Sequence, residues 1–489
     1  MARREIGPVP YEAFRQRVRR HRRTDVILAV AALNSYLERV NFGLAPAVRF
    51  PNFVNPFSLG GVARTALISG KDHRGQPVEH QDLVEMCSYY ANLAEPELEN
   101  ESGPEWLRNA ATRMAYEQSG YQLSAMENIG RTLPLLSDHS SGCPDAPTAD
   151  DWTEVLGVTL EQFIQLGFAM HVAGLMNEGK IDRETLKLDR VSIIFAPLDA
   201  DYALEIMDRW FAGSLKELRS AGACAEVPGL EKWSLSPLVT KPVVALPDGR
   251  YTIPWPSLLL DRFTPTGLYF IGRKAFGTSF PNALGTMFQS YVGSQLALLQ
   301  HAVVNPEIRY GKSSARTVDF FIVTQEVVVL VEVKAARPIW ATRLGDPAGD
   351  EDTEKKVGYA FTQIERTAQL IKKRHKALAI IPTDRPLRGL VVTLEPFHLV
   401  NSRFYYDVQK SRSISTTVAS SHELEGTVAA LLSARDTGSR LLDALTPEHP
   451  GTPTRLGKAT EGLENTPNPP LHEAWRRFSQ PWSEQQHDG

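Results

Sequence analysis

The stretch of residues 317–338, TVDFFIVTQEVVVLVEVKAARP, predicts two β-strands joined by a short turn. Residues 318–323 are apolar except for Asp319, and residues 327–333 are mostly valine except for Leu330 and Glu332, a composition typical of buried strands. If the two strands pair as a hairpin, Asp319 lies beside Glu332 near one end of the sheet. Two carboxylates held together require a partner charge, and a divalent cation is the natural one.

The second strand ends in Glu332-Val333-Lys334, and side-chain alternation places the glutamate and the lysine on one face. Together with Asp319, these residues give a D-(x)12-E-x-K pattern that resembles the PD-(D/E)XK nuclease superfamily. The resemblance implies that Asp319 and Glu332 hold Mg²⁺ (or Mn²⁺), with the carbonyl of Val333 as a further ligand. It also implies that Lys334 positions or activates the attacking water. Val318 stands where the family pattern has proline.

This pattern is informative only when both strands are considered together. A bare E-x-K is a weak signal, because strands often end in charged residues. An aspartate in one strand, a turn and then an apolar strand ending in E-V-K is much rarer. The alternative interpretation is an ordinary hairpin with solvated ends.

A helix is predicted on each side of the hairpin, over residues 283–300 and 354–374. In the first helix, the resemblance implies a residue that helps to bind the metal, usually glutamate. The matching position holds Gln289, a weaker and neutral ligand, and a displaced acid such as Glu307 is the alternative. In the second helix, the resemblance implies that Gln363 reaches the active site or the substrate.

Basic residues on the second helix are candidates for contacts with nucleic-acid phosphates. The candidates are Lys355, Lys356, Arg366 and Lys373. The alternative for each of them is the charged, solvated face of a surface helix.

The fold class predicted from the sequence is α/β. Further strands are predicted at residues 238–246, 251–254, 268–271, 378–381 and 390–394. The resemblance implies that residues 233–407 form a nuclease domain with a restriction-endonuclease-like mixed sheet flanked by helices. We expect mainly α-helical regions at 1–134 and 150–232, a C-terminal helix within 408–445, and a Pro-, Thr- and Gly-rich tail at 446–489 that is largely disordered.

The N-terminal half offers weaker signals. Residues 1–23 are rich in arginine, and they form either an arm that contacts phosphates or, as favoured here, the solvated face of a helix. A strand is expected at residues 191–195 and a helix at 199–221. His73, His80 and His171 are read as loop or packing histidines in preference to metal ligands. We expect this half to be a helical module for recognition, assembly or regulation.

Composition sets limits on the class of protein. With 489 residues, the chain is long enough for two or three domains. The net charge of −4 gives no overall attraction to nucleic acid, so any binding must rely on a local basic patch. Three scattered cysteines predict a reducing, cytoplasmic location without a disulfide framework. No apolar run approaches the roughly 20 residues of a membrane span, and no secretory signal is expected.

Taken together, the residues and the resemblance predict a Mg²⁺-dependent nuclease that hydrolyses phosphodiester bonds, with DNA as the favoured substrate. A nuclease domain fused to a helical module also resembles restriction or antiphage defence proteins, which implies a partner protein, and a homodimer would suit double-strand cutting. The alternatives are a nuclease-like domain that has lost hydrolysis and binds nucleic acid or a partner, and an unrelated α/β regulatory protein in which Glu332 and Lys334 merely pair with each other.

Overall fold

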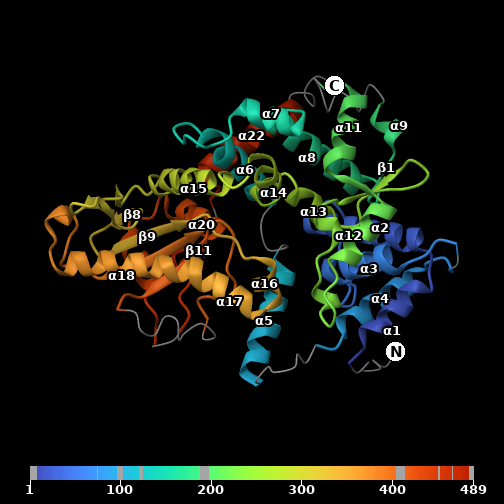
Figure 1. Ribbon diagram of the computed structural model, residues 1–489, viewed down its shortest axis with the longest axis horizontal. Coiled ribbons are helices and arrows are strands. Elements are labelled where there is room, and N and C mark those ends of the chain that lie inside the picture. The colour runs from blue at the N-terminus through green and yellow to red at the C-terminus, as the bar shows by residue number, and fades with distance from the viewer. Residues whose placement is uncertain are drawn as a thin grey trace.

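The computed structural model describes residues 8–73, 75–95, 103–119, 125–187, 198–402, 413–449, 452–464 and 466–483. The chain is a mixed α/β protein, as the sequence predicts, with a five-stranded sheet on one side and a mainly helical region on the other (Figure 1). Among the described helices, none is by itself long and apolar enough to cross a membrane, although one pair bent by 46° passes the length and composition test together.

The five-stranded sheet has the strand order β11-β10-β9-β8-β5. Strand β8 runs antiparallel to both of its neighbours, whereas β9, β10 and β11 run parallel to one another. The strands are β5 (Val303–Pro306), β8 (Phe320–Val323), β9 (Val328–Lys334), β10 (Leu387–Thr393) and β11 (Thr416–Ser420). The sheet is therefore mixed, and it contains the predicted strands at 318–333 and 390–394.

The central hairpin forms as its sequence predicts. Phe320 pairs with Val331 and Val323 with Val328 across the two strands. The turn is closed by the Thr324 amide, which donates to the Val327 carbonyl at 3.0 Å. Every residue from Val328 to Val333 is buried, so the valine run forms the centre of the sheet and not an edge.

Helices cover both faces of the sheet (Figure 1). Alternate residues of β9, including Val329 and Val331, pack into one core with α15 (Phe280–Leu296) and α20 (Ser421–Leu431). Val328 and Leu330 face the other core, which contains α18 (Tyr359–Lys372). The chain enters α18 through a π-helical turn, Glu354–Gly358, so the helices predicted before and after the hairpin are both present.

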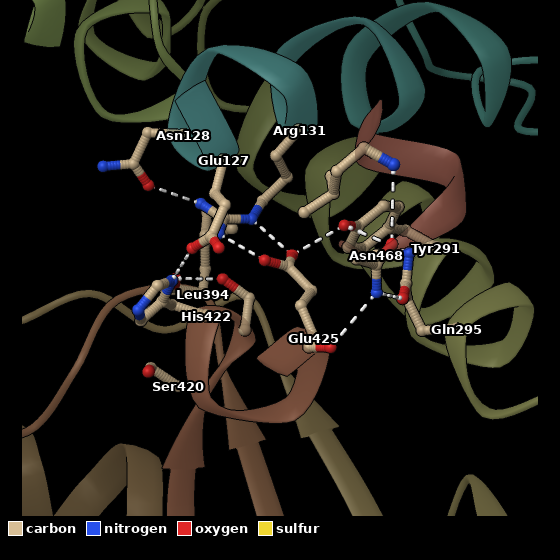
Figure 2. Close-up of polar contacts among 12 residues, drawn as sticks. Glu127, Asn128, Arg131, Tyr291, Gln295, Leu394, Ser420, His422, Glu425 and Asn468 are labelled. Atoms are coloured by element: carbon tan, nitrogen blue, oxygen red, sulfur yellow. Dashed lines mark hydrogen bonds and ion pairs between the residues drawn. The ribbon is translucent and has the colours of Figure 1, made fainter. Parts of the chain in front are cut away.

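A buried network of hydrogen bonds and ion pairs connects α20 with distant parts of the chain (Figure 2). The Glu425 carboxylate accepts hydrogen bonds from Arg131 Nε and Nη2, each at 2.5 Å, and from Tyr291 Oη at 2.6 Å. Asn468 Nδ2 donates to the Gln295 side-chain oxygen at 2.7 Å and to the Glu425 backbone carbonyl at 3.1 Å. Because these residues come from α6 (Ala125–Leu133), α15, α20 and the C-terminal segment, one cluster joins four separate parts of the chain.

The first half of the chain is mainly helical, as predicted. Its helices are α1 (Tyr11–Arg19), α2 (Arg23–Asn41), α3 (Pro56–Ser69), α4 (His80–Ala91), α5 (Gly103–Ser119), α6 (Ala125–Leu133), α7 (Ala149–Leu156), α8 (Leu160–Met176), α9 (Arg183–Leu186), α11 (Ala200–Trp210) and α12 (Leu215–Cys224), with a π-helical turn at Pro134–Asp138. A capping box formed by Thr159 and Gln162 begins α8. The helix expected over residues 199–221 is interrupted by a short strand, and the strand expected at 191–195 lies outside the described residues.

Several arginines of the basic N-terminal segment have acidic partners within the fold. Arg17 Nη2 lies 2.9 Å from Asp82 and 2.5 Å from Glu85, and Arg23 Nη2 lies 2.5 Å from Asp72. The charges of Arg17 and Arg23 are therefore used within the fold, which favours the structural interpretation for these two residues. Arg19, Arg20 and Arg22 are exposed, and Arg3 and Arg4 lie outside the described residues.

A second, four-stranded sheet has the order β1-β4-β3-β2. Its strands are β1 (Lys180–Ile181), β2 (Ala212–Ser214), β3 (Val243–Ala245) and β4 (Tyr251–Thr252). The hairpin predicted at residues 238–254 is therefore present as β3 and β4. It pairs with β1 and β2 from the preceding region, although we expected it to open the nuclease domain at residue 233.

Two predicted strands are wrong. Residues 268–271 belong to α14 (Pro265–Phe276). Leu378 ends a 3₁₀ turn, Lys376–Leu378, which is capped by the His375 side chain accepting from the Ala377 amide, and residues 379–381 form a further turn. A run of four apolar residues cannot distinguish a strand from one turn of a buried helix.

The remaining short helices are α13 (Pro256–Asp261), α16 (Trp340–Leu344) and α17 (Pro347–Thr353), with 3₁₀ turns at Glu231–Trp233 and Pro237–Val239.

The C-terminal segment is ordered over its described part, so the prediction of a largely disordered tail is wrong. After α21 (Thr437–Ala444), the chain forms a 3₁₀ helix, Leu456–Thr460, and then α22 (Pro469–Ser483). Leu471 is part of the core and Ala474 is also buried. Trp475 packs edge-on against Phe168 of α8 at 5.3 Å between ring centroids. These few apolar residues lie at helical spacing, so α22 buries one face despite its polar composition.

Truncating the buried leucine of α22 tests this packing. Leu471 is 3% exposed, so we expect Leu471→Ala to lower the free energy of unfolding by about 2–5 kcal/mol. Urea denaturation checks the value, and the exposed neighbour in His472→Ala serves as the control. Equal stabilities for the two variants would mean that the segment does not pack against α6 and α8.

Candidate functional site

The hairpin brings the two predicted acidic residues together on one face of the sheet. Phe320 pairs with Val331, so the next positions outward, Asp319 and Glu332, lie opposite each other. The Asp319 carboxylate reaches across the strand, and its Oδ2 accepts the Val333 amide at 2.7 Å. The predicted proximity of the carboxylates is thus a direct result of the hairpin register.

Lys334 and Gln363 join the acidic pair from β9 and α18. Lys334 Nζ donates to Glu332 Oε1 at 2.6 Å and to Gln363 Oε1 at 2.9 Å. The same ammonium group lies 5.3 Å from the ring centroid of Tyr359, at the start of α18. The lysine is therefore held by a carboxylate and an amide while its side chain remains 26% exposed.

Gln289 approaches the site from α15, on the other side of the hairpin. Its Nε2 donates to Asp319 Oδ1 at 2.8 Å, so both oxygens of that carboxylate are engaged. In this arrangement, the hydrogen bond from Gln289 positions Asp319, which is one of the two candidate metal ligands. The other acid considered from the sequence, Glu307, forms ion pairs with Arg316 at 3.5 Å and Arg309 at 3.9 Å.

Burial makes the negative charge of both carboxylates unfavourable. The pKa of Glu332 is raised to about 8, mainly because the group is buried and secondarily because of the charge of Asp319. Burial also raises the pKa of Asp319 to about 6, although the hydrogen bond from the Val333 amide opposes the change. Glu332 Oε2 is buried without a hydrogen-bond partner among the described residues. One cation beside both groups would remove these penalties.

The residues present fit a hard divalent cation in charge and in ligand type. Mg²⁺ and Mn²⁺ prefer carboxylate and carbonyl oxygens, which Asp319, Glu332 and the carbonyl of Val333 would supply. Within the described parts of the chain, no group of three or more His, Cys, Asp or Glu side chains is arranged to hold a metal. The site therefore offers two acidic ligands, with its remaining ligands coming from the main chain, water or substrate.

The predicted phosphate-contacting residues differ in their surroundings. Lys355, Arg366 and Lys373 are exposed along α18 and its ends, where they are accessible to a ligand. Lys356 is held inside the fold, because its Nζ donates to the Arg337 carbonyl at 3.0 Å and to Asp352 at 2.7 Å. Three of the four candidates thus keep an exposed position.

The histidines considered in the sequence have structural surroundings. His171 is buried, and its Nε2 lies 3.2 Å from Glu38 Oε1. His80 begins α4, and its ring lies 5.9 Å from the Phe50 ring. These placements agree with packing or loop roles.

Tyr359 and the short strands before the hairpin were not predicted as parts of the site. Tyr359 is 61% exposed although it lies beside Lys334. Its position four residues before Gln363, on the same helical face, is the signal that marks it in the sequence. The sequence around Gly311 also carries a signal, because basic residues flank a glycine turn just before Asp319.

The raised pKa values predict how stability depends on pH and metal. Each folded carboxyl binds its proton more tightly than the unfolded one, so these groups lower stability as pH rises from about 4 to 8. A cation that binds the charged forms reverses this loss, and we expect Mg²⁺ to raise the melting temperature more at pH 8 than at pH 5. Differential scanning fluorimetry with and without Mg²⁺ measures both effects. A Mg²⁺-induced shift of the same size in Asp319→Asn would contradict the assignment.

The end of β9 thus combines two hydrogen-bonded sets of side chains, Gln289 with Asp319, and Gln363 with Lys334 and Glu332. Together they contain two carboxylates, an ammonium group and two amides. Such a set can bind a divalent cation and, beside it, donate a proton or a hydrogen bond to an oxyanion. Comparisons of the chain with protein-family models, curated proteins and solved structures find no match.

Proposed function

We propose that this protein is a metal-dependent nuclease that hydrolyses phosphodiester bonds, with DNA as the favoured substrate. The observation that carries the proposal is the cluster of Asp319, Glu332 and Lys334 at the end of one hairpin, where the buried Oε2 of Glu332 has no hydrogen-bond partner among the described residues. The order of helix, hairpin, helix and strand given by α15, β8–β9, α18 and β10 supports a restriction-endonuclease-like core.

The proposed mechanism assigns a role to each side chain. Asp319, Glu332 and the carbonyl of Val333 would hold Mg²⁺ (or Mn²⁺), and the bound ion would supply neutralisation of phosphate charge and a lowered pKa for a water molecule. Lys334 orients the attacking water or stabilises negative charge on the phosphate through its ammonium group. Gln363 positions this lysine through the 2.9 Å hydrogen bond.

Binding of the nucleic acid is assigned to the exposed cations near the site. Lys355, Arg366 and Lys373 lie on α18 and its ends, and each can contact a phosphate without reading its sequence. A local patch is required because the chain has a net charge of −4.

The helical first half suits a role in restriction or antiphage defence inside the cell. In that role, it would recognise a partner protein or another signal and control the nuclease. A second copy of the chain would supply the second site needed for a double-strand cut.

A second candidate function is supported by Gln289. Where a glutamate would add a third negative charge, this residue is a neutral amide that hydrogen-bonds to Asp319. A site with weakened metal binding would suit a nuclease-like domain that binds nucleic acid or a partner without cleaving.

Digestion of plasmid DNA and RNA with Mg²⁺ tests the proposed function. The wild-type protein is expected to cleave, whereas Asp319→Ala and Lys334→Ala are expected to be inactive. Gel retardation without Mg²⁺ that persists in both variants, together with no cleavage by the wild type, would favour the binding domain. Absence of both activities would leave an unrelated regulatory protein in which Glu332 and Lys334 form only an ion pair.

A further inference from the structure

We propose that the site accepts an unpaired nucleic-acid strand, with one base stacked on Tyr359 and neighbouring phosphates bound by the hairpin of β6 (Arg309–Tyr310) and β7 (Ala315–Arg316). This inference rests on the proposed nuclease function and specifies the form of its substrate. Neither Tyr359 nor this hairpin has a role in the proposed metal centre.

Tyr359 presents an aromatic ring at the proposed reaction centre. Its side chain starts α18 and is 61% exposed, while the ammonium group of Lys334 lies 5.3 Å from its ring centroid. Gln363, one turn later, accepts a hydrogen bond from the same ammonium group. An exposed ring fixed beside the catalytic lysine can stack on a base next to the scissile phosphate.

The β6–β7 hairpin carries exposed positive charge and ends three residues before Asp319 in the chain. Arg309 and Arg316 pair with each other across the hairpin, and their side chains are 63% and 60% exposed. Both contact Glu307, so two cations share this carboxylate. Lys312 is exposed at the tip, next to Gly311, whose φ of +68° allows the tight turn.

Aromatic contacts fix the hairpin against α18. The Tyr310 ring lies 5.5 Å from the Arg366 guanidinium carbon and 5.6 Å from the His375 ring. Thr317, directly after β7, accepts the Ile308 amide through its hydroxyl at 2.9 Å. The hairpin is therefore held on the helix that carries Tyr359 and Gln363.

Helical spacing aligns these groups into one path for a strand. Tyr359 and Arg366 are seven residues apart, which places them on the same side of α18 at about 10 Å along its axis. Lys373 lies a further two turns along, at about 21 Å from Tyr359. Gln363 and Lys334 lie between the ring at one end and the cations at the other, so a bound strand would pass the proposed centre.

The form of the substrate follows from the geometry of stacking. Bases inside a duplex are covered on both faces by their neighbours, so a protein ring can stack only on a base that has left the duplex. Phosphate contacts by arginine and lysine carry no such requirement. The exposed ring beside Lys334 therefore favours a single strand, a frayed end or a flipped nucleotide over an intact duplex.

Fluorescence measurements in EDTA test binding separately from cleavage. A labelled single-stranded oligonucleotide that contains 2-aminopurine is titrated with the full chain, and anisotropy and base fluorescence are recorded. We expect Tyr359→Leu to weaken binding about 5- to 150-fold and to abolish the quenching of 2-aminopurine, whereas Tyr359→Phe retains both. Phe42→Leu, which removes another exposed aromatic ring far from the site in sequence, is the matched control.

The hairpin makes an independent prediction for the salt dependence of binding. Plotted against the logarithm of salt concentration, log K falls with a negative slope. Each phosphate contact that is lost makes this slope less steep by about 0.7 for a single strand. Arg309→Gln and Lys312→Gln are each expected to produce such a decrease without changing the quenching of 2-aminopurine. An unchanged slope in both variants would contradict the role of the hairpin.

Two outcomes separate this inference from the proposed function. If wild-type protein binds single strands with the Tyr359 dependence described but never cleaves them with Mg²⁺, the inference stands and the nuclease assignment fails. If the protein cleaves, but binds duplex as tightly as single strand and is unaffected by Tyr359→Leu, the inference is overturned and the nuclease assignment stands.

Discussion

Replacing Glu332 by glutamine is expected to lower the rate of Mg²⁺-dependent cleavage at least about 100-fold, because a metal ligand contributes several kcal/mol to the transition state. The same change is expected to keep or increase the stability of the metal-free protein at pH 8. Burial raises the pKa of this carboxyl to about 8, so a neutral amide of similar shape suits the folded environment better than a carboxylate does.

The two opposite effects distinguish a functional carboxylate from a structural one. Single-turnover cleavage and thermal melting at pH 8 measure them in one preparation. Asp261→Asn is the matched control, because burial raises the pKa of Asp261 to about 7 while the residue lies outside the proposed centre. That control should gain stability without losing cleavage. A large loss of stability in Glu332→Gln would instead assign Glu332 to an ion pair with Lys334 that supports the fold.

Replacing Arg131 by methionine is expected to lower the free energy of unfolding by about 3–5 kcal/mol, because Glu425 would remain buried with a charge that has lost its main partner. Arg131 provides two hydrogen bonds to this carboxylate, and only Tyr291 donates a further side-chain hydrogen bond to it among the described residues. The cluster joins α6, α15 and α20, so its loss loosens contacts between the helical half and the sheet.

Chemical denaturation of a double-mutant cycle checks this assignment. Arg131→Met and Glu425→Gln are compared with the double variant, which removes both charges. We expect the double variant to be more stable than the sum of the two single losses predicts, because no charge remains without a partner. Additive losses would mean that the two side chains contribute independently.

The central hairpin was predictable because its information is local. A valine run and a short turn fix the register, and the register places Asp319 opposite Glu332. Gln363, which the resemblance singled out, lies beside Lys334, and the apolar stripe of its helix already placed it away from the buried face. The strands at 268–271 and 378–381 were wrong because four apolar residues fit a helix equally well.

Features that depend on distant residues were not predictable from the sequence. Strand β11 begins with Thr416 and Thr417, and its polar composition does not predict a strand. It forms a strand by pairing with β10. The C-terminal segment is helical because α22 packs against α6 and α8, and Leu471 is part of this contact. Lys356 became a structural residue only through the carbonyl of Arg337 and the carboxylate of Asp352.

The long sequence separation within the Arg131–Glu425 pair has a consequence for biosynthesis. The two residues are 294 positions apart, so at about 5–20 residues per second a ribosome takes roughly 15–60 s to deliver the second after the first. Strand β11, which completes the sheet, also emerges in that late interval. The contact between Arg131 and Glu425 can therefore form only after residue 425 has left the ribosome, whereas the core built from residues 9–246 can pack earlier. The proposed hydrolytic centre gains the support of this contact only at that later stage.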